Sequence, residues 1–202
     1  MTTASSLSLH FDALFGANPD PWGTRVRWYE QRKRALTLAM LPAARYERAF
    51  EPGCAIGELT AALAPRCDEL LATDASAAAV VHAKQRLARM TNVHVGWGSV
   101  PDDWPEGPFD LIVISELGYY LSEEALRRTA ALAKSSKRRG ATLVACHWRR
   151  GASDILQSAE HVHATLAAGF GGARIAHYED DDILLDVWSD DERSTAQRDG
   201  LA

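Results

Sequence analysis

The stretch with the clearest chemical pattern is FEPGCAIGEL, residues 50–59, a glycine-containing loop after a short apolar run. Loops that bind dinucleotides read G-x-G-x-x-G, because the glycines serve the tight turn, the approach of a pyrophosphate and close helix packing. Here Gly53 is present, but Ala55 and Glu58 occupy the other two glycine positions. The Glu51 carboxylate would also repel a pyrophosphate. An acidic residue before an amide-rich turn suits a ligand that carries an ammonium group.

A second carboxylate, Asp74, ends the apolar run of residues 70–73, twenty-one residues after Gly53. A carboxylate at this place, after the second strand of a nucleotide-binding fold, can accept hydrogen bonds from both hydroxyls of a ribose. The alternative is a helix cap, since a helical pattern begins at Ser76 and Asp is a frequent capping residue. Together with the preceding loop, the pattern favours contact of Asp74 with a ribose.

Two more titratable side chains stand where apolar runs end, Glu116 after residues 109–115 and His147 near the end of residues 141–148. Because ligands bind beyond the carboxyl ends of parallel strands, both side chains are expected in one crevice. Either can act as a general base, and Glu116 can also attract a cation. His147 titrates near physiological pH. The alternative for His147 is a hydrogen-bonded structural residue beside Trp148.

The elements that must position these residues alternate between short apolar runs and helical patterns. The apolar runs cover residues 48–51, 68–74, 92–98, 109–116 and 141–148. The apolar tetrad Leu-Ile-Val-Ile at 111–114 does not alternate with polar residues, which is typical of a strand buried on both faces of a parallel sheet. Ser76 and Ser122 precede helical patterns as N-caps. The alternation predicts an α/β fold with a doubly wound sheet and helices on both faces.

The last two apolar runs break this alternation. Residues 173–179 and 183–189 are strand-like and are separated only by Asp180–Asp182. So short a connection requires an antiparallel hairpin. A doubly wound sheet that ends in an antiparallel pair resembles the class I methyltransferases that use S-adenosylmethionine. That resemblance implies a mostly parallel seven-stranded sheet of order 3-2-1-4-5-7-6 with an antiparallel last strand.

Length and composition fit one globular domain. The chain has 202 residues, of which 47% are hydrophobic and 24% charged, enough to bury one core but cramped for two. We expect a methyltransferase domain at residues 25–189, an N-terminal extension or lid at 1–24 and a disordered tail at 190–202.

Charge and cysteine content exclude several classes of ligand. Asp and Glu number 27 against 22 Lys and Arg, and no basic stripe is present, so nucleic acid is not expected as a partner. No apolar stretch is long enough to span a bilayer, which predicts a soluble, cytoplasmic protein without membrane contact. The three cysteines lack a CxxC pattern, and His161 and His163 point apart on a helix, so no metal is expected. The oligomeric state does not follow from the sequence.

Five stretches resemble one family within the class I superfamily. The most specific is DPWGTRVRWYEQRKRALTLAML at residues 20–41; the others are LATDASAAAV, DDWPEGPFD, FDLIVISELGYYL and LVACHWRR. They are similar to the nodulation protein S family, N-methyltransferases whose named member methylates the amino group of a deacetylated chitooligosaccharide. The loop from Glu51 to Gly57 resembles the superfamily's first motif, E/D-x-G-x-G-x-G, with Ala55 at the central glycine.

The resemblance implies S-adenosylmethionine as cofactor and an amine on a small molecule or amino sugar as methyl acceptor. Two alternatives remain open: O-methylation of a hydroxyl with His147 as base, and a catalytically silent protein that only binds the cofactor. A bound amine must lose a proton before it can attack a methyl group, so Glu116 and His147 are the candidate catalytic residues.

The remaining candidates lie near the N-terminus or after strands. Arg32 interrupts an apolar helix stripe, and a guanidinium there needs an anion, either the cofactor carboxylate or a structural salt-bridge partner. In all, the residues expected at the cofactor are Arg32, Glu51, Gly53, Ala55, Gly57, Asp74, Ala75, Ser99, Val100 and Ser115. Those expected around the acceptor are Trp22, Tyr29, Tyr119, Tyr120 and Trp148, with ordinary core packing as the alternative for these aromatics.

Overall fold

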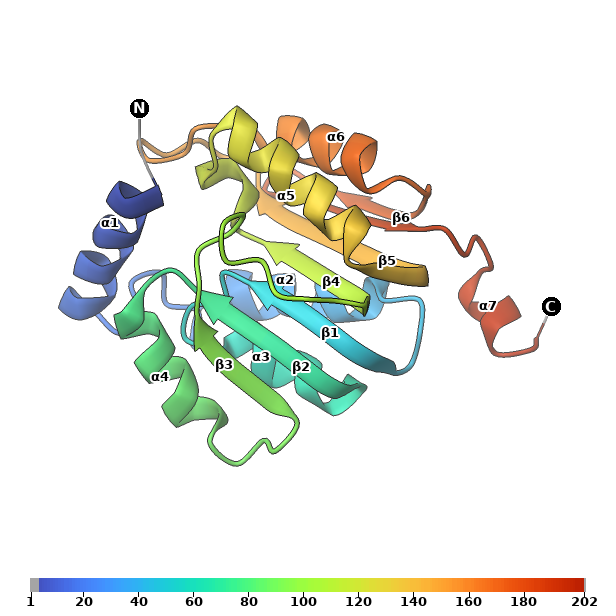
Figure 1. Cartoon of the computed structure of the whole chain (residues 1–202), viewed down its shortest axis with the longest axis horizontal. Helices are drawn as coiled ribbons and strands as arrows, with labels where there is room; N and C mark the ends of the chain where they lie inside the picture. Colours follow the sequence, from blue (N-terminus) through green and yellow to red (C-terminus); the bar gives the residue numbers. More distant parts are fainter. Residues whose placement is uncertain (1–3, 202) are drawn as a thin grey trace.

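The computed structural model describes residues 4–201, with side chains from Leu7 onward (Figure 1). Its α-helices are α1 (Ala4–Ala17), α2 (Trp28–Met40), α3 (Glu58–Leu63), α4 (Ala77–Leu87), α5 (Glu123–Ser135), α6 (Ala159–Phe170) and α7 (Thr195–Arg198). Two 3₁₀ turns are η1 (Ala64–Arg66) and η2 (Gly118–Tyr120). The strands are β1 (Tyr46–Pro52), β2 (Cys67–Asp74), β3 (Val93–Trp97), β4 (Phe109–Ser115), β5 (Lys137–Trp148), β6 (Ala173–Glu179) and β7 (Ile183–Ser189).

The seven strands form one sheet in the order β3-β2-β1-β4-β5-β7-β6, which confirms the predicted fold class. Strands β1 to β5 pair in parallel. Strand β7 pairs antiparallel with both β5 and β6, and the β6–β7 connection is the short Asp180–Asp182 turn. The carboxyl ends of β1, β2, β4 and β5 therefore meet at one edge of the sheet, where the candidate residues lie.

Side chains of each central strand point alternately to the two faces of the sheet, so the core divides into two layers. Ile112 and Ile114 of β4 pack with α5 and α6, which lie in front of the sheet in Figure 1. Leu111 and Val113 pack in the other layer, behind the sheet, with α2 and α3. Because β4 is buried on both faces, it reads as a continuous apolar run rather than an alternating one.

Serine side chains cap the helices α4 and α5, which follow β2 and β4. Ser76 Oγ accepts a hydrogen bond from the amide of Ala79 at the start of α4, and Ser122 Oγ accepts one from Ala125 at the start of α5. Both caps confirm the pattern in the sequence. Acidic residues in the first turn of α5 and Lys134 in its last turn also match the helix macrodipole.

The C-terminal tail, which the sequence predicts to be disordered, contains a short helix in the structure. Residues 195–198 form α7, where Ser194 and Gln197 make a capping box. Asp191 pairs with both Arg193 and Arg198, which ties this turn to the end of β7. The prediction rested on polar composition, which does not register such local capping and ion-pair contacts. Within residues 4–201, no helix combines the length and apolarity needed to cross a membrane.

Candidate functional site

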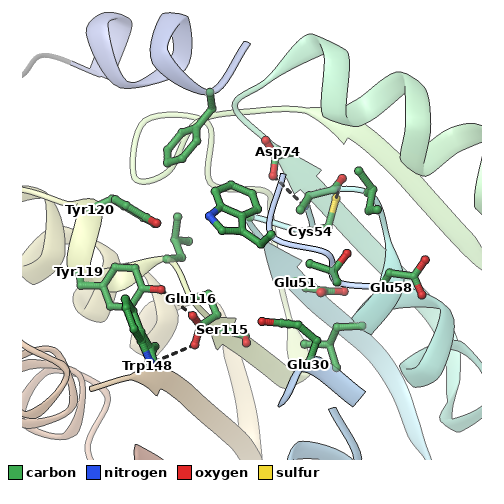
Figure 2. Close-up of a pocket in the computed structure, with 18 of the residues that line it drawn as sticks. Glu30, Glu51, Cys54, Glu58, Asp74, Ser115, Glu116, Tyr119, Tyr120 and Trp148 are labelled. Carbon is green, nitrogen blue, oxygen red and sulfur yellow. Dashed lines mark hydrogen bonds between the residues drawn. The ribbon is translucent and has the colours of Figure 1, made fainter. Parts of the chain in front are cut away.

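A cavity of about 470 Å³ opens at the carboxyl ends of β1, β2, β4 and β5, beneath α1 and beside α2 (Figure 2). The predicted residues that line it are Trp22, Tyr29, Glu51, Gly53, Ala55, Asp74, Ala75, Ser99, Val100, Ser115, Glu116, Tyr119, Tyr120 and Trp148. Arg32, Gly57 and His147 do not belong to this wall. The cavity therefore gathers most of the candidate residues from segments far apart in the chain.

The loop after β1 makes a tight turn against β2. The amides of Gly53 and Cys54 both donate to the Thr73 carbonyl, at 2.7 and 3.0 Å. Gly53 has φ 74° and Gly57 has φ 81°, a region that favours glycine. A Cβ on Gly57 would also lie 2.8 Å from Leu87 Cδ1 of α4. Gly57 thus serves the turn and helix packing rather than the cavity wall, which corrects its predicted place.

Ala55 also adopts a left-handed conformation, with φ 49°. The Cβ of an L-residue meets the following carbonyl there, which costs roughly 1–2 kcal/mol. The neighbouring contacts hold the turn in this form, since the Ala55 amide donates to Asp74 Oδ2 at 2.8 Å. Loss of the central glycine therefore leaves the turn geometry in place and adds local strain.

Glu51 ends β1 with its side chain almost fully buried in the cavity wall, 3% exposed. Among the described residues, its Oε2 atom has no hydrogen-bond partner. Burial raises the pKa of Glu51 to about 8; the nearby Thr60 hydroxyl acts against this rise, and the Asp74 carboxylate acts with it. Thr60 Oγ1 makes no hydrogen bond of its own among the described residues, so it does not satisfy Glu51 Oε2. A buried acceptor without a donor is unfavourable unless a ligand supplies one. An ammonium group would both fill this place and favour the ionised carboxylate.

Asp74 lies across the loop from Glu51 (Figure 2). Its Oδ2 accepts from the Ala55 amide, and its Oδ1 accepts from the Ser76 amide at 2.9 Å. Burial raises its pKa to about 6, although these amides act against that rise. The cap of α4 is Ser76 itself, so Asp74 is not needed for that task. Each of its oxygens keeps a second lone pair with which it can accept from a ligand in the cavity.

Glu116 stands on the opposite side of the cavity, in the turn after β4 (Figure 2). Its backbone is left-handed, with φ 55°. Its Oε1 accepts from the Trp148 amide at 2.8 Å, and its Oε2 accepts from the Tyr119 hydroxyl at 2.6 Å. Trp148 thus acts on Glu116 through its main chain. A strained turn therefore holds a carboxylate in the cavity at a fixed orientation.

Lys33 and Glu30 are members of the site that sequence reasoning missed. Lys33 Nζ lies 3.0 Å from Glu30 Oε2 and 3.5 Å from Glu116 Oε2. Burial alone would lower the pKa of Lys33, but the two carboxylates outweigh it and raise that pKa, so the lysine keeps its charge. The i, i+3 spacing of Glu30 and Lys33 was a visible signal for a pair on one helix face. What was not visible is that this face turns toward the cavity.

Arg32, the neighbouring residue on α2, lies outside the cavity. Its Nη1 pairs with Asp180 Oδ2 at 2.8 Å, and its Nη2 donates to the Tyr178 hydroxyl. Successive helix residues differ by about 100° in direction, so Arg32 and Lys33 face different neighbours. The anion that Arg32 requires comes from the β6–β7 turn, and the salt-bridge alternative replaces the predicted cofactor contact.

His147 is fully buried and does not line the cavity. Its Nε2 accepts from the Gly118 amide at 3.1 Å, and its Nδ1 lies 3.0 Å from His163 Nε2. Burial lowers the pKa of His147 well below its usual value, and the neighbouring His163 adds to this effect. The structure therefore corrects the prediction of His147 as a base in the crevice. It has the structural role that the sequence left as an alternative.

Aromatic residues cover the cavity from the N-terminal side. Phe11 packs edge-on to Tyr120 with ring centroids 5.0 Å apart, and Phe15 packs on Trp22 at 5.3 Å. Trp22 and Tyr120 were predicted here, whereas Phe11 and Phe15 were not, because the first helix carries no residue pattern that marks a ligand site. Tyr29 lies deeper, and within the described part of the chain its buried hydroxyl has no partner.

Comparison with known proteins gives a consistent family. The nodulation protein S (NodS) family matches residues 14–142. The chain is 34% identical to nodulation protein S of Sinorhizobium fredii over 117 residues, which are 56% of this chain and 53% of that protein. It is 35% identical to that of Rhizobium tropici over 120 residues, 56% of this chain and 48% of that protein. The chain thus matches about half the length of these curated relatives.

Solved structures agree with this result. A proposed methyltransferase from Pseudomonas syringae is 48% identical, with a TM-score of 0.73 over 81% of this chain and 99% of that one. The N-methyltransferase NodS from Bradyrhizobium japonicum, in complex with S-adenosyl-L-homocysteine, is 25% identical, with a TM-score of 0.77 over 94% of this chain and 100% of that one. The chain belongs to the nodulation protein S family.

Proposed function

We propose that this protein is an S-adenosylmethionine-dependent methyltransferase that methylates an amine on a small molecule or amino sugar. The cofactor half of the proposal rests on Glu51, whose buried, unpartnered oxygen lies in the cavity wall of the described structure. Family membership supports the same cofactor, because one relative was solved with S-adenosyl-L-homocysteine.

The residues on the β1–β2 side fit such a cofactor. Glu51 would accept from its ammonium group, and Asp74 with Ala75 would hold its ribose. The adjoining Ser99 and Val100 would border its adenine, and Ser115 its amino-acid part. When bound, S-adenosylmethionine supplies an electrophilic methyl group on a sulfonium. The task left to this chain is to position an acceptor beside it and to exclude water.

The acceptor half rests on charge at the other end of the cavity. Glu30 and Glu116 carry two formal negative charges, and Lys33 between them carries one positive charge. This group therefore has one uncompensated negative charge in a largely buried setting, which favours a cationic acceptor such as an ammonium over a neutral hydroxyl. This charge balance is the observation that carries the choice of N-methylation.

The bases available in the cavity also favour an amine over a hydroxyl as the methyl acceptor. Lys33 keeps its proton and His147 does not line the cavity, so neither serves as a base there. The O-methyltransferase alternative needs a base for a hydroxyl and relied on His147. An amine needs only to release a proton to Glu116 or water, after which its lone pair is free to attack. The aromatic cover from α1 and Trp22 would act as a lid that limits water.

The test is calorimetry with S-adenosyl-L-homocysteine followed by methyl-transfer assays. We expect micromolar or tighter binding, weakened about tenfold or more by Asp74→Ala, because the proposed ribose contacts and the acceptor of the Ala55 amide are both lost. Asp68→Ala, an exposed position at the start of the same strand, is the matched control and should bind normally. Absence of binding by the unaltered protein rejects the proposed cofactor.

The acceptor is tested with matched pairs that differ only in an amine or a hydroxyl, such as glucosamine and glucose oligomers. We expect mass spectrometry to detect methyl transfer only among the amines of a broad panel. Transfer confined to hydroxyls would reject N-methylation while keeping the cofactor. Tight cofactor binding without turnover on any acceptor would instead support the silent-binder alternative.

A further inference from the structure

A buried series of polar groups runs from the turn after β4, beside the cavity, to strand β7. The Gly118 amide of η2 donates to His147 Nε2 of β5 at 3.1 Å. His147 Nδ1 lies 3.0 Å from His163 Nε2 of α6, and His163 Nδ1 lies 2.7 Å from Asp186 Oδ2 of β7. Both histidines and Asp186 are buried, with at most 4% of each residue exposed.

The direction of every hydrogen bond in this series, from Gly118 to Asp186, follows from the groups at its two ends. A backbone amide only donates, so His147 Nε2 must present a lone pair. The neutral ring then carries its proton on Nδ1 and donates it to His163 Nε2. A carboxylate only accepts, so His163 carries its own proton on Nδ1 and donates it to Asp186. One arrangement of two neutral rings satisfies all four groups.

We infer that His147, His163 and Asp186 form a positioning relay that fixes the Gly118 turn and thereby the placement of Glu116 and Tyr119 in the cavity. The relay takes no part in proton transfer to a ligand, because no member reaches the cavity. His147 and His163 are positioning residues in this inference. It deepens the proposed function, since it concerns the same turn as the acceptor site.

The turn that the relay holds is strained and tightly packed. Glu116 has φ 55°, and its amide donates to the Cys146 carbonyl at 2.9 Å. The Tyr119 ring packs edge-on to His147 with centroids 5.2 Å apart. A Cβ on Gly118 would lie 2.4 Å from Val162 Cγ1 and 3.2 Å from His147 Nε2. Only a glycine lets the backbone approach the imidazole this closely, and the turn needs an external anchor to keep its conformation.

The charged groups around the relay favour the same protonation state. Asp186 Oδ1 also accepts from His177 Nδ1 at 2.8 Å and from Arg174 Nη1 at 3.3 Å. Burial alone would raise the pKa of Asp186, but the bonds from His163 and His177 outweigh it and lower that pKa, so the carboxylate stays ionised. The positive charge of Lys33 further disfavours a cationic His147. In the part of the chain that the structure describes, no group of three or more His, Cys, Asp or Glu side chains is arranged to hold a metal ion.

The direct test is ¹⁵N NMR of the imidazole rings in the unaltered protein. We expect the His147 ring to stay neutral from pH 6 to 8 with its proton on Nδ1, because burial lowers its pKa, and the His163 ring to carry its proton on Nδ1 as well. A proton on Nε2 of His147, or protonation of His147 within this range, would overturn the relay.

Two variants test the positioning role. His147→Gln keeps an acceptor oxygen near the place of Nε2, whereas His147→Leu removes it. We expect the Gly118 amide to exchange with solvent about tenfold faster in His147→Leu, with recovery in His147→Gln, because a buried amide without an acceptor opens more easily. His161→Leu, on the exposed face of α6, is the control and should leave Gly118 unchanged. Equal exchange in the Gln and Leu variants would contradict the inference.

These readouts need neither cofactor nor acceptor, so they separate the relay from the proposed function. Should His147→Leu fail to fold, the measurement of ring protons in the unaltered protein still decides the inference. Absence of S-adenosyl-L-homocysteine binding would reject the proposed function and leave the relay standing. The wrong ring proton would reject the relay and leave the methyltransferase proposal standing.

Discussion

The two ends of the cavity are built in different ways. The end with Glu51 and Asp74 comes from two adjacent strands and the loop between Gly53 and Gly57, all within a short stretch of sequence. The end with Glu116 combines α2, the turn after β4 and the end of β5. The first end is visible as a sequence motif because local geometry creates it. The second exists only after distant segments have packed together.

The two ends also differ in how their charges are balanced. Glu51 is a buried carboxylate without a cation beside it in the described structure, and its oxygen lacks a donor. Glu116 is a carboxylate with a hydroxyl, an amide and a lysine around it. In the described structure, the first end thus leaves a buried acceptor without a donor, whereas the carboxylate of the second end is paired by groups of the chain itself. Variants that remove one charge should therefore affect the two ends in opposite ways.

The largest expected effect is that of Lys33→Met. Removal of the ammonium leaves Glu30 and Glu116 unpaired in a buried group, which should lower the free energy of unfolding by about 3–5 kcal/mol. Urea denaturation followed by circular dichroism measures this change. Adding Glu30→Gln to Lys33→Met should recover part of the lost stability. The control Lys134→Met, at a solvent-exposed position of α5, should change the free energy of unfolding little. A loss under about 1 kcal/mol would mean that this end is not held by charge pairing.

Glu51→Gln should act in the opposite sense on stability. Without ligand the variant should be more stable at pH 8, since it removes a buried charge that lacks a partner, but it should bind S-adenosyl-L-homocysteine about tenfold or more weakly. In the folded protein the pKa of Glu51 is raised from its usual 4.5 to about 8. The stabilising contribution of this carboxyl is therefore present below pH 4.5 and is lost as the pH rises through 8.

Thermal unfolding from pH 5 to 8 tests this sign. The unaltered protein without ligand should lose more stability over this range than Glu51→Gln does. The raised pKa of Asp74, about 6, contributes a similar loss in both proteins and so cancels in the comparison. Parallel curves for the two proteins would show that Glu51 is already satisfied without a ligand.

The smallest effect is expected from Ala55→Gly. Relief of the left-handed alanine is partly offset by the greater freedom of glycine in the unfolded chain, so the net gain should be at most about 1 kcal/mol. The control Ala131→Gly changes a solvent-exposed residue in the middle of α5. It should instead lower the free energy of unfolding by about 1 kcal/mol. Chemical denaturation of both variants measures these changes. A loss of stability in Ala55→Gly would show that the turn carries no strain.

Sequence reasoning predicted the fold and brought together the residues at the Glu51–Asp74 end of the cavity, because both follow from local patterns. Unalternating apolar residues marked β4, serine caps marked α4 and α5, and the short Asp180–Asp182 turn required the terminal hairpin. The spacing from Gly53 to Asp74 placed two strand ends side by side. These signals depend on residues close in the chain, where backbone geometry leaves few choices.

The Glu116 end of the cavity was harder to predict from the sequence, because the direction of side chains at strand and helix ends depends on packing. His147 occupies a strand end aimed toward the crevice, yet its ring turns inward to the Gly118 amide. Arg32 and Lys33 are adjacent in sequence, and only the packing of α2 decides that Lys33 reaches the cavity. Phe11 and Phe15 join the wall through the docking of α1, which no spacing rule predicts.

Two non-glycine residues of the described chain, Ala55 and Glu116, adopt positive φ, and both line the cavity. The fold thus stores its backbone strain on the walls of its ligand site, where the surrounding sheet compels both turns. Laboratory evolution for heat resistance alone would therefore tend to install glycine at both positions. At Ala55 that change keeps every side chain of the proposed site, but at Glu116 it would remove the carboxylate on which the proposed acceptor site rests. Selection for stability alone would therefore work against the proposed function.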